Sequence, residues 1–135
     1  MIAFRVEGLP PSYNRHFKIN YSFREVYLSP EAHQFKNLIK ITMPHNGFPK
    51  DCLFKMSLEY HGNFFYKNGN HKKIDMQNMD KLLIDAIFEG LGRDDSHLWE
   101  LHQKKIQSTI PFTLIKIESL PCPSSEAIKE TTSLS

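Results

Sequence analysis

One segment, residues 75–92, limits the fold of this chain more than any other stretch. It reads DMQNMDKLLIDAIFEGLG, and apolar residues cover most of the circumference of a helix with about 3.6 residues per turn. The helix is predicted to start at about Asp75 or Asn78 and to end at Glu89, before Gly90 and Gly92. Four of its polar residues, Asn78, Lys81, Asp85 and Glu89, share one narrow stripe. A helix this apolar is normally buried on several sides, by a sheet and by something more, such as a partner subunit.

The rest of the chain supplies the predicted sheet and one further helix. Ser29 and Pro30 are a helix cap and a first helical residue, so a second amphipathic helix should run from Ser29 to just before Pro44. Loops are predicted at residues 9–18 and, as a basic hairpin or loop, at 61–73. Alternating or extended patterns predict strands at residues 2–8, 24–28, 52–60, 98–106 and 110–117. This order predicts an α+β domain with a mixed sheet flanked by two helices.

Length and composition indicate one globular unit. At 135 residues, with 40% hydrophobic residues, the chain can build a single core, which we place at residues 1–119. Residues 120–135 are polar and rich in Pro, Ser and Thr, and we expect a flexible tail. Cys52 and Cys122 form no disulfide framework, and no apolar run is long enough to span a membrane. We therefore expect a cytoplasmic protein with no membrane partner and no small-molecule cofactor.

Carboxylates lie at both ends of the apolar helix, with Asp75 at its start and Asp94 and Asp95 beyond its end. If they met, they would repel one another and favour a divalent cation such as Mg²⁺. A helix of about 14 residues is roughly 21 Å long. For the acids at its two ends to meet, the chain must turn back after the helix or a second subunit must contribute. The alternatives are structural, because Asp75 alone is commonly a helix cap and the other two are commonly a solvated turn.

Three motifs, taken together, resemble the RusA family of Holliday junction resolvases, which are dimeric Mg²⁺-dependent endonucleases of bacteria and phages. LPPSYNRHFK (9–18) is similar to the family's Pro-Pro-Ser-x-Asn signature after the first strand. DMQNMDK (75–81) is similar to its Asp-x-Asp-Asn-x-x-Lys motif, and DDSHLWELHQKK (94–105) is similar to its Asp-Asp-x-Gln-Val segment with the basic strand that follows. The resemblance covers Phe4 to about Glu118, essentially the whole domain.

The resemblance implies catalytic roles for Asp75, Lys81 and Asp95, with Asp94 as a supporting residue. Asp75, Asp94 and Asp95 would then hold Mg²⁺, with Mn²⁺ as a possible substitute, and Lys81 would stabilise charge on a DNA phosphate. Resolving a four-way junction in recombination and repair requires two symmetric cuts, and hence a homodimer.

The chain departs from the family at one motif position, where Gln77 replaces the second Asp. An amide supplies only a neutral carbonyl oxygen, so the site loses one negative charge. Asp80, one helical turn away, is a hypothetical replacement. The alternative to an active nuclease is therefore a non-catalytic junction-binding protein impaired by Gln77, and a purely structural dimer is a third interpretation.

Local positive charge indicates where DNA would bind, since a net charge of +2 decides nothing by itself. The aromatic residues 64–66 either stack on bases or belong to the core, and Lys104 and Lys105 either extend the basic surface or protect a solvated strand edge. Seven histidines show no Cys/His spacing for zinc. The residues that we expect to contact DNA are Asn14, Arg15, Lys18, Lys67, Lys72, Lys73 and Asn78.

Overall fold

A computed structural model of the chain describes residues 1–11, 17–20, 25–44 and 47–121. Asn14 and Arg15, which we expect to contact DNA, and nearly all of the expected tail lie outside these residues. The elements in chain order are β1 (Ile2–Glu7), β2 (Phe17–Asn20), β3 (Glu25–Leu28), α1 (Pro30–Thr42), β4 (Leu53–Gly62), α2 (Met76–Leu91), the short 3-10 helix η2 (Asp95–His97), β5 (Leu98–Gln107) and β6 (Phe112–Leu120).

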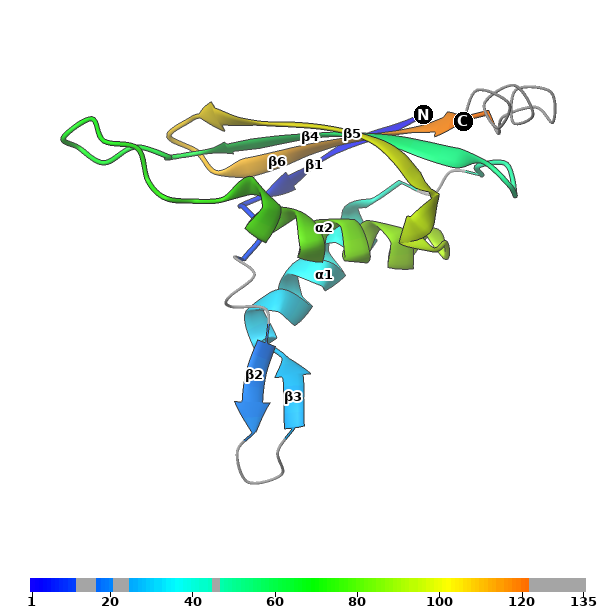
Figure 1. Cartoon of the computed structure of the whole chain (residues 1–135), viewed down its shortest axis with the longest axis horizontal. Helices are drawn as coiled ribbons and strands as arrows, with labels where there is room; N and C mark the ends of the chain where they lie inside the picture. The colour runs from blue at the N-terminus through cyan, green and yellow to red at the C-terminus, as the bar shows by residue number, and fades with distance from the viewer. Residues whose placement is uncertain (12–16, 21–24, 45–46, 122–135) are drawn as a thin grey trace, which may run out of the picture.

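Four strands form the main sheet in the order β1-β6-β4-β5 (Figure 1). β6 pairs antiparallel with both β1 and β4, whereas β5 pairs parallel with β4. Parallel neighbours cannot be joined by a tight turn, and α2 lies in the crossover between them. The sheet is therefore mixed, and with two helices the α+β prediction is confirmed.

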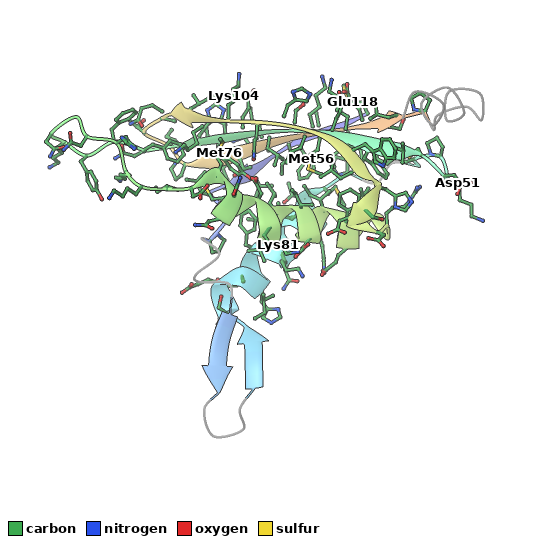
Figure 2. All side chains as sticks on the ribbon, in the orientation of Figure 1. Asp51, Met56, Met76, Lys81, Lys104 and Glu118 are labelled. Carbon is green, nitrogen blue, oxygen red and sulfur yellow. The ribbon has the colours of Figure 1, made fainter. Side chains whose placement is uncertain are left out.

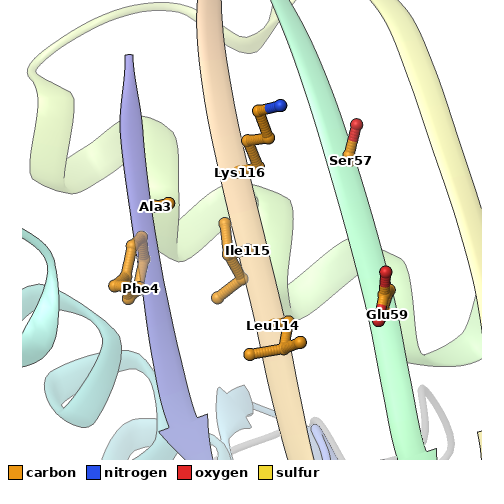
Figure 3. Close-up of a pocket in the computed structure, with 7 residues that line it drawn as sticks. All are labelled: Ala3, Phe4, Ser57, Glu59, Leu114, Ile115 and Lys116. Carbon is orange, nitrogen blue, oxygen red and sulfur yellow. The ribbon is translucent and has the colours of Figure 1, made fainter.

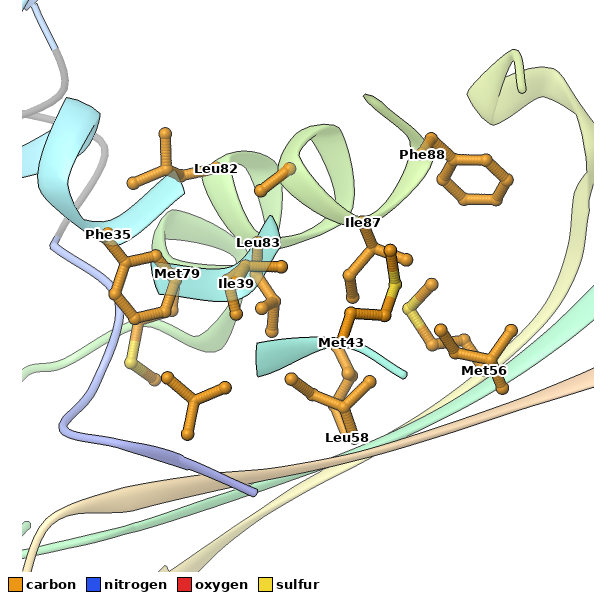
Figure 4. Close-up of a cluster of buried hydrophobic side chains, with 14 of the residues drawn as sticks. Phe35, Ile39, Met43, Met56, Leu58, Met79, Leu82, Leu83, Ile87 and Phe88 are labelled. Atoms are coloured by element: carbon orange, nitrogen blue, oxygen red, sulfur yellow. The ribbon is translucent and has the colours of Figure 1, made fainter. Parts of the chain in front are cut away.

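Both helices lie on the same side of the sheet (Figure 1). β4 shows why, because its residues alternate strictly and every second one, including Met56 and Leu58, is buried. These side chains pack with those of α1 and α2 in one core (Figure 4). From α2 the core takes Met79, Leu82, Leu83, Ala86, Ile87 and Phe88, so the apolar circumference seen in the sequence is buried between sheet and α1.

On the opposite face of the sheet, the described part of the chain places no helix (Figure 1). A shallow hollow of about 240 Å³ lies on this face (Figure 3), and small, charged and apolar residues line it. Ser57 and Glu59 of β4 and Lys116 of β6 lie in this hollow. We call this surface the open face.

The predicted helix starts and the end of α1 agree with the structure; α2 differs, because Gly90 lies inside the helix and Gly92 ends it, and the chain has an additional hairpin. Ser29 caps α1 by accepting the Ala32 N–H at 3.2 Å, and α2 continues two residues beyond the predicted Glu89, to Leu91. The last two residues of the expected loop 9–18, Phe17 and Lys18, begin β2 (Phe17–Asn20), which pairs with β3 in a separate two-stranded sheet. The prolines near the start of that stretch indicated a loop, but they do not prevent a four-residue strand from starting at Phe17.

Candidate functional site

Asp75 holds the N-terminal end of α2. Its carboxylate accepts the Gln77 N–H at 3.0 Å, and its carbonyl accepts the Asn78 N–H at 3.1 Å. An aspartate here also suits the positive end of the helix dipole. The structural alternative for Asp75 is therefore observed, and the carboxylate remains exposed.

The C-terminal end of α2 is held by more contacts. Gly92 adopts a left-handed conformation with φ of 68°, which a residue with a Cβ rarely adopts. The Arg93 N–H then bonds the Phe88 carbonyl at 3.0 Å. The Arg93 guanidinium donates to the carbonyls of residues 48, 49 and 50, each at 2.9 Å, and lies 5.6 Å from the Phe54 ring centroid. This end of the helix is thereby tied to the loop that precedes β4.

The two adjacent acids follow Arg93 at once. Asp94 caps η2 by accepting the Ser96 N–H at 3.1 Å, and this bond lowers the pKa of the Asp94 carboxyl, helped by a side-chain contact with Asp95. His97 Nδ1 lies 3.1 Å from the Asp94 carbonyl oxygen. Asp94 therefore has a local structural role, while Asp95 is exposed on the first residue of η2.

A pocket of about 300 Å³ lies between α2 and η2, and it gathers several of the predicted site residues. Lys81 Nζ lies 3.5 Å from Asp85 Oδ1, one helical turn along, and its side chain is more than half exposed. Figure 2 places Lys81 on the helix side of the molecule. The pocket is lined by Gln77, Asp80, Lys81, Ile84, Asp85 and Asp95. The chain does turn back after α2, since Asp95 borders the same space as Gln77.

Asp80 forms the buried wall of this pocket. It is 8% exposed, and the Tyr60 hydroxyl of β4 donates to its Oδ1 at 2.5 Å. Burial raises the pKa of the Asp80 carboxyl; hydrogen bonds from Tyr60 and Gln103 offset part of this shift, and the charge of Asp75 adds to it. Burial and the bond to Asp80 raise the pKa of Tyr60 as well. Gln103 Oε1 is buried and has no hydrogen-bond partner among the residues that the structure describes.

The predicted metal ligands are not brought together within one chain. Asp75 is not among the residues lining the pocket, although its charge influences Asp80. Across residues 1–11, 17–20, 25–44 and 47–121, no group of three or more His, Cys, Asp or Glu side chains is placed to hold a metal ion. The donor types nonetheless fit Mg²⁺, which commonly takes one or two carboxylates and completes its shell with water and substrate phosphates.

Basic residues precede the N-terminal end of α2. Lys67 and Lys73 are exposed, and Lys72 Nζ lies 5.6 Å from the Tyr66 ring centroid. Phe65 and His71 pair in an antiparallel bridge, as expected for a basic hairpin. Phe64 is buried, whereas Phe65 and Tyr66 are exposed, so the aromatic run divides between core and surface. Of the remaining expected DNA contacts, Lys18 lies in β2 and Asn78 in the first turn of α2.

Sequence reasoning missed Tyr60, Gln103 and Arg93. Tyr60 and Gln103 reach Asp80 because β4 and β5 are neighbours in the sheet, where Leu58 pairs with Gln103 and Tyr60 with Lys105. One signal was present in the sequence: Gln103 is a polar residue at a position of its strand that faces the core, where a polar side chain needs a hydrogen-bond partner. Nothing local identified Arg93, whose partners lie more than 40 residues away.

Comparison with protein families decides the assignment. A family model described as Endodeoxyribonuclease RusA matches residues 7–118. The chain belongs to the RusA family. The match extends from the end of β1 into β6. It therefore includes the pocket and the three sequence motifs at residues 9–18, 75–81 and 94–105. A comparison with curated proteins found no match. None of the described helices is long and apolar enough to cross a membrane.

Proposed function

We propose that this RusA-family chain is a Mg²⁺-dependent endonuclease that resolves four-way DNA junctions in recombination and repair, as a homodimer in the cytoplasm of a bacterium or its phage. The observation that carries the proposal is the pocket in which Asp95 and Lys81 lie beside Gln77, the position of a family carboxylate. Family membership over residues 7–118 supports nuclease chemistry at this pocket.

The proposed metal ligands are Asp75, Asp94 and Asp95, with Mn²⁺ as an alternative ion. α2 has 16 residues and a length of roughly 24 Å, and Asp75 caps its far end, so we propose that Asp75 of the partner subunit completes the set. When bound, the ion would polarise the scissile phosphate and activate a water molecule. Lys81, more than half exposed, would contact the phosphate and stabilise its developing charge.

The protein surface around α2 would position the junction. Lys67, Lys72 and Lys73 precede the exposed Asp75, so phosphates bound by these lysines would lie next to the acidic end of the helix. Asn78 would add a polar contact from the first helical turn, and Asn14, Arg15 and Lys18 would extend the binding surface. Binding through phosphates reads the shape of the junction and weakens steeply with salt.

The direct test incubates the full chain with a synthetic four-way junction and a linear duplex, with Mg²⁺, Mn²⁺ or a chelator. We expect metal-dependent symmetric nicks in the junction alone. Lack of preference for the junction over the duplex would overturn the proposal. Leu120 ends β6 and pairs with Leu53, so the domain extends at least one residue beyond the expected boundary at 119. Removal of residues 122–135, the rest of the proposed tail, is expected to leave cleavage unchanged.

A second candidate function is junction binding without cleavage, and Gln77 favours it. This amide lines the pocket where the family has a carboxylate, so the site has one negative charge fewer. Junction binding with no metal-dependent nick in the natural chain, together with nicks by Gln77→Asp, would establish this function. Equal cleavage by both proteins would exclude it.

A further inference from the structure

β5 forms an edge of the sheet that no other described strand covers. It is ten residues long and pairs only with β4 in the part of the chain that the structure describes. A long edge of unpaired backbone groups is prone to pairing with another chain. Trp99 is 62% exposed and Leu101 is 37% exposed on the same strand. Exposed apolar residues on an open edge favour a protein partner over solvent.

The two sides of β5 follow from its register with β4. Leu101 and Gln103 pair with Met56 and Leu58, so they belong to the helix side. The intervening residues Glu100, His102 and Lys104 pair with Lys55, Ser57 and Glu59 and belong to the open face. Lys104 lies on this open face in Figure 2. Its ammonium is 3.8 Å from the Glu59 carboxylate and its side chain is 64% exposed.

The charges along β5 are self-complementary in one register. If two copies of β5 pair antiparallel about a two-fold axis at His102, Glu100 of each copy lies opposite Lys104 of the other. Residues directly opposite share a face, so each dimer gains two favourable charge pairs. Moving the axis to Gln103 places His102 opposite Lys104, and moving it to Lys104 places the two lysines opposite one another. Both shifts lose the attraction.

We propose that two copies of this chain associate edge to edge through β5, antiparallel and centred on His102, to form one continuous eight-stranded sheet. The inference rests on the homodimer in the proposed function and specifies its interface. A two-fold axis there also reverses the direction of α2 between copies. The end of the helix bearing Asp75 in one copy then lies level with the Asp95 end in the other, which suits a site that is incomplete within one chain.

A charge swap tests the register. Glu100→Lys and Lys104→Glu should each raise the dimer dissociation constant about tenfold, because two attractive pairs become two repulsive ones. The double variant Glu100→Lys with Lys104→Glu should restore the natural dissociation constant. Sedimentation velocity measures the three values, and thermal unfolding confirms that each variant folds. A dimer unaffected by either single variant, or no restoration in the double variant, would overturn the proposal.

A symmetric disulfide tests the axis independently of charge. In a Cys122→Ser background, where Cys52 is buried, His102→Cys places two thiols opposite one another across the axis. Their Cα atoms would be about 4.5–5.5 Å apart, within the span that a disulfide bridges, about 4.4–6.8 Å. We expect rapid cross-linked dimer under mild oxidation, and none from Lys116→Cys on the open face of β6. Equal cross-linking of the two variants would contradict the model of the interface.

The outcomes separate this inference from the proposed function. If the natural chain dimerises and cuts junctions while the swap and the cross-link fail, the β5 interface is wrong and the nuclease proposal stands. If both interface tests succeed and the junction is neither preferred nor cut, the nuclease proposal fails alone. A natural chain that sediments as a monomer at tens of micromolar overturns the interface, whatever its activity.

Discussion

The two halves of α2 hold their carboxylates in different ways. In the N-terminal half, Asp75 is exposed and, among the residues that the structure describes, bonds to its own first turn, while Asp80 is buried against the sheet. At the C-terminal end, Glu89 is bound by two lysines of α1, and Arg93 fastens the following turn to three carbonyls. The difference indicates that the C-terminal end of α2, just before Asp94 and Asp95, is held by tertiary contacts, whereas among the described residues the N-terminal end at Asp75 is held by helix capping.

The largest expected effect is on junction cleavage, from a substitution that separates the two roles of Asp75, helix cap and proposed metal ligand. Asn caps helices as well as Asp does, so Asp75→Asn should keep the thermal unfolding temperature while removing a proposed metal ligand. We expect junction cleavage to fall by more than about 100-fold, with junction binding retained. Asp75→Ala should lose the cap too, at about 1 kcal/mol of unfolding free energy. Asp51→Asn, on the loop before β4, is the matched control for cleavage; full activity of Asp75→Asn would end the catalytic assignment.

At the opposite end, the contacts of Arg93 predict a loss of stability. Arg93→Ala removes the guanidinium from three carbonyls, and we expect the free energy of unfolding to fall by about 2 kcal/mol in urea titration. Lys offers a single ammonium in place of the planar fork, so Arg93→Lys should recover only part of this loss. If Arg93→Ala is as stable as the natural chain, the C-terminal end of α2 is no better anchored than the N-terminal end.

The pH dependence of the unfolding free energy tests the burial of Asp80 in the N-terminal half of α2. Its pKa is raised in the folded state from an ordinary value of 3.8, so just above pH 3.8 the folded chain keeps a proton that the unfolded chain has lost. The free energy of unfolding should therefore fall as pH rises from 3.8 to the raised pKa. Asp80→Asn should flatten that part of the pH profile, with stability followed by chemical denaturation. An unchanged slope would show that burial does not control this carboxyl.

Glu89 should change the pH dependence of the unfolding free energy less than Asp80 does, and in the opposite direction. Bonds from Lys36 and then Lys40 lower the pKa of the Glu89 carboxyl from 4.5, so its contribution is present above pH 4.5 and is lost as pH falls through the lowered value. The pairs are partly exposed and solvent screens them. Glu89→Gln should therefore cost only about 0.5 kcal/mol at neutral pH. Lys81→Met, which removes an i, i+4 pair on the same helix, is the control for a pair with no contact to α1.

The sequence by itself determined both helices and the position of the acids along α2. Ser29 with Pro30, and Asp75 with Gly92, act within a few residues of themselves, so their effects are readable locally. The motifs around Gln77 and Asp95 also carried the family assignment, which the match over residues 7–118 confirms. The homodimer, the metal and the individual ligands remain predictions.

Only the tertiary structure decided what surrounds those acids. Alternation in β4 and β5 is the same for parallel and antiparallel pairing, so it could not place Gln103 and Tyr60 against Asp80. The bonds from Arg93 to the carbonyls of residues 48–50 likewise depend on packing, because they require the end of α2 to lie beside the loop that precedes β4. Caps and periodicity are local properties of a segment, whereas a pocket is made by residues whose contact depends on the packing of the whole sheet and both helices.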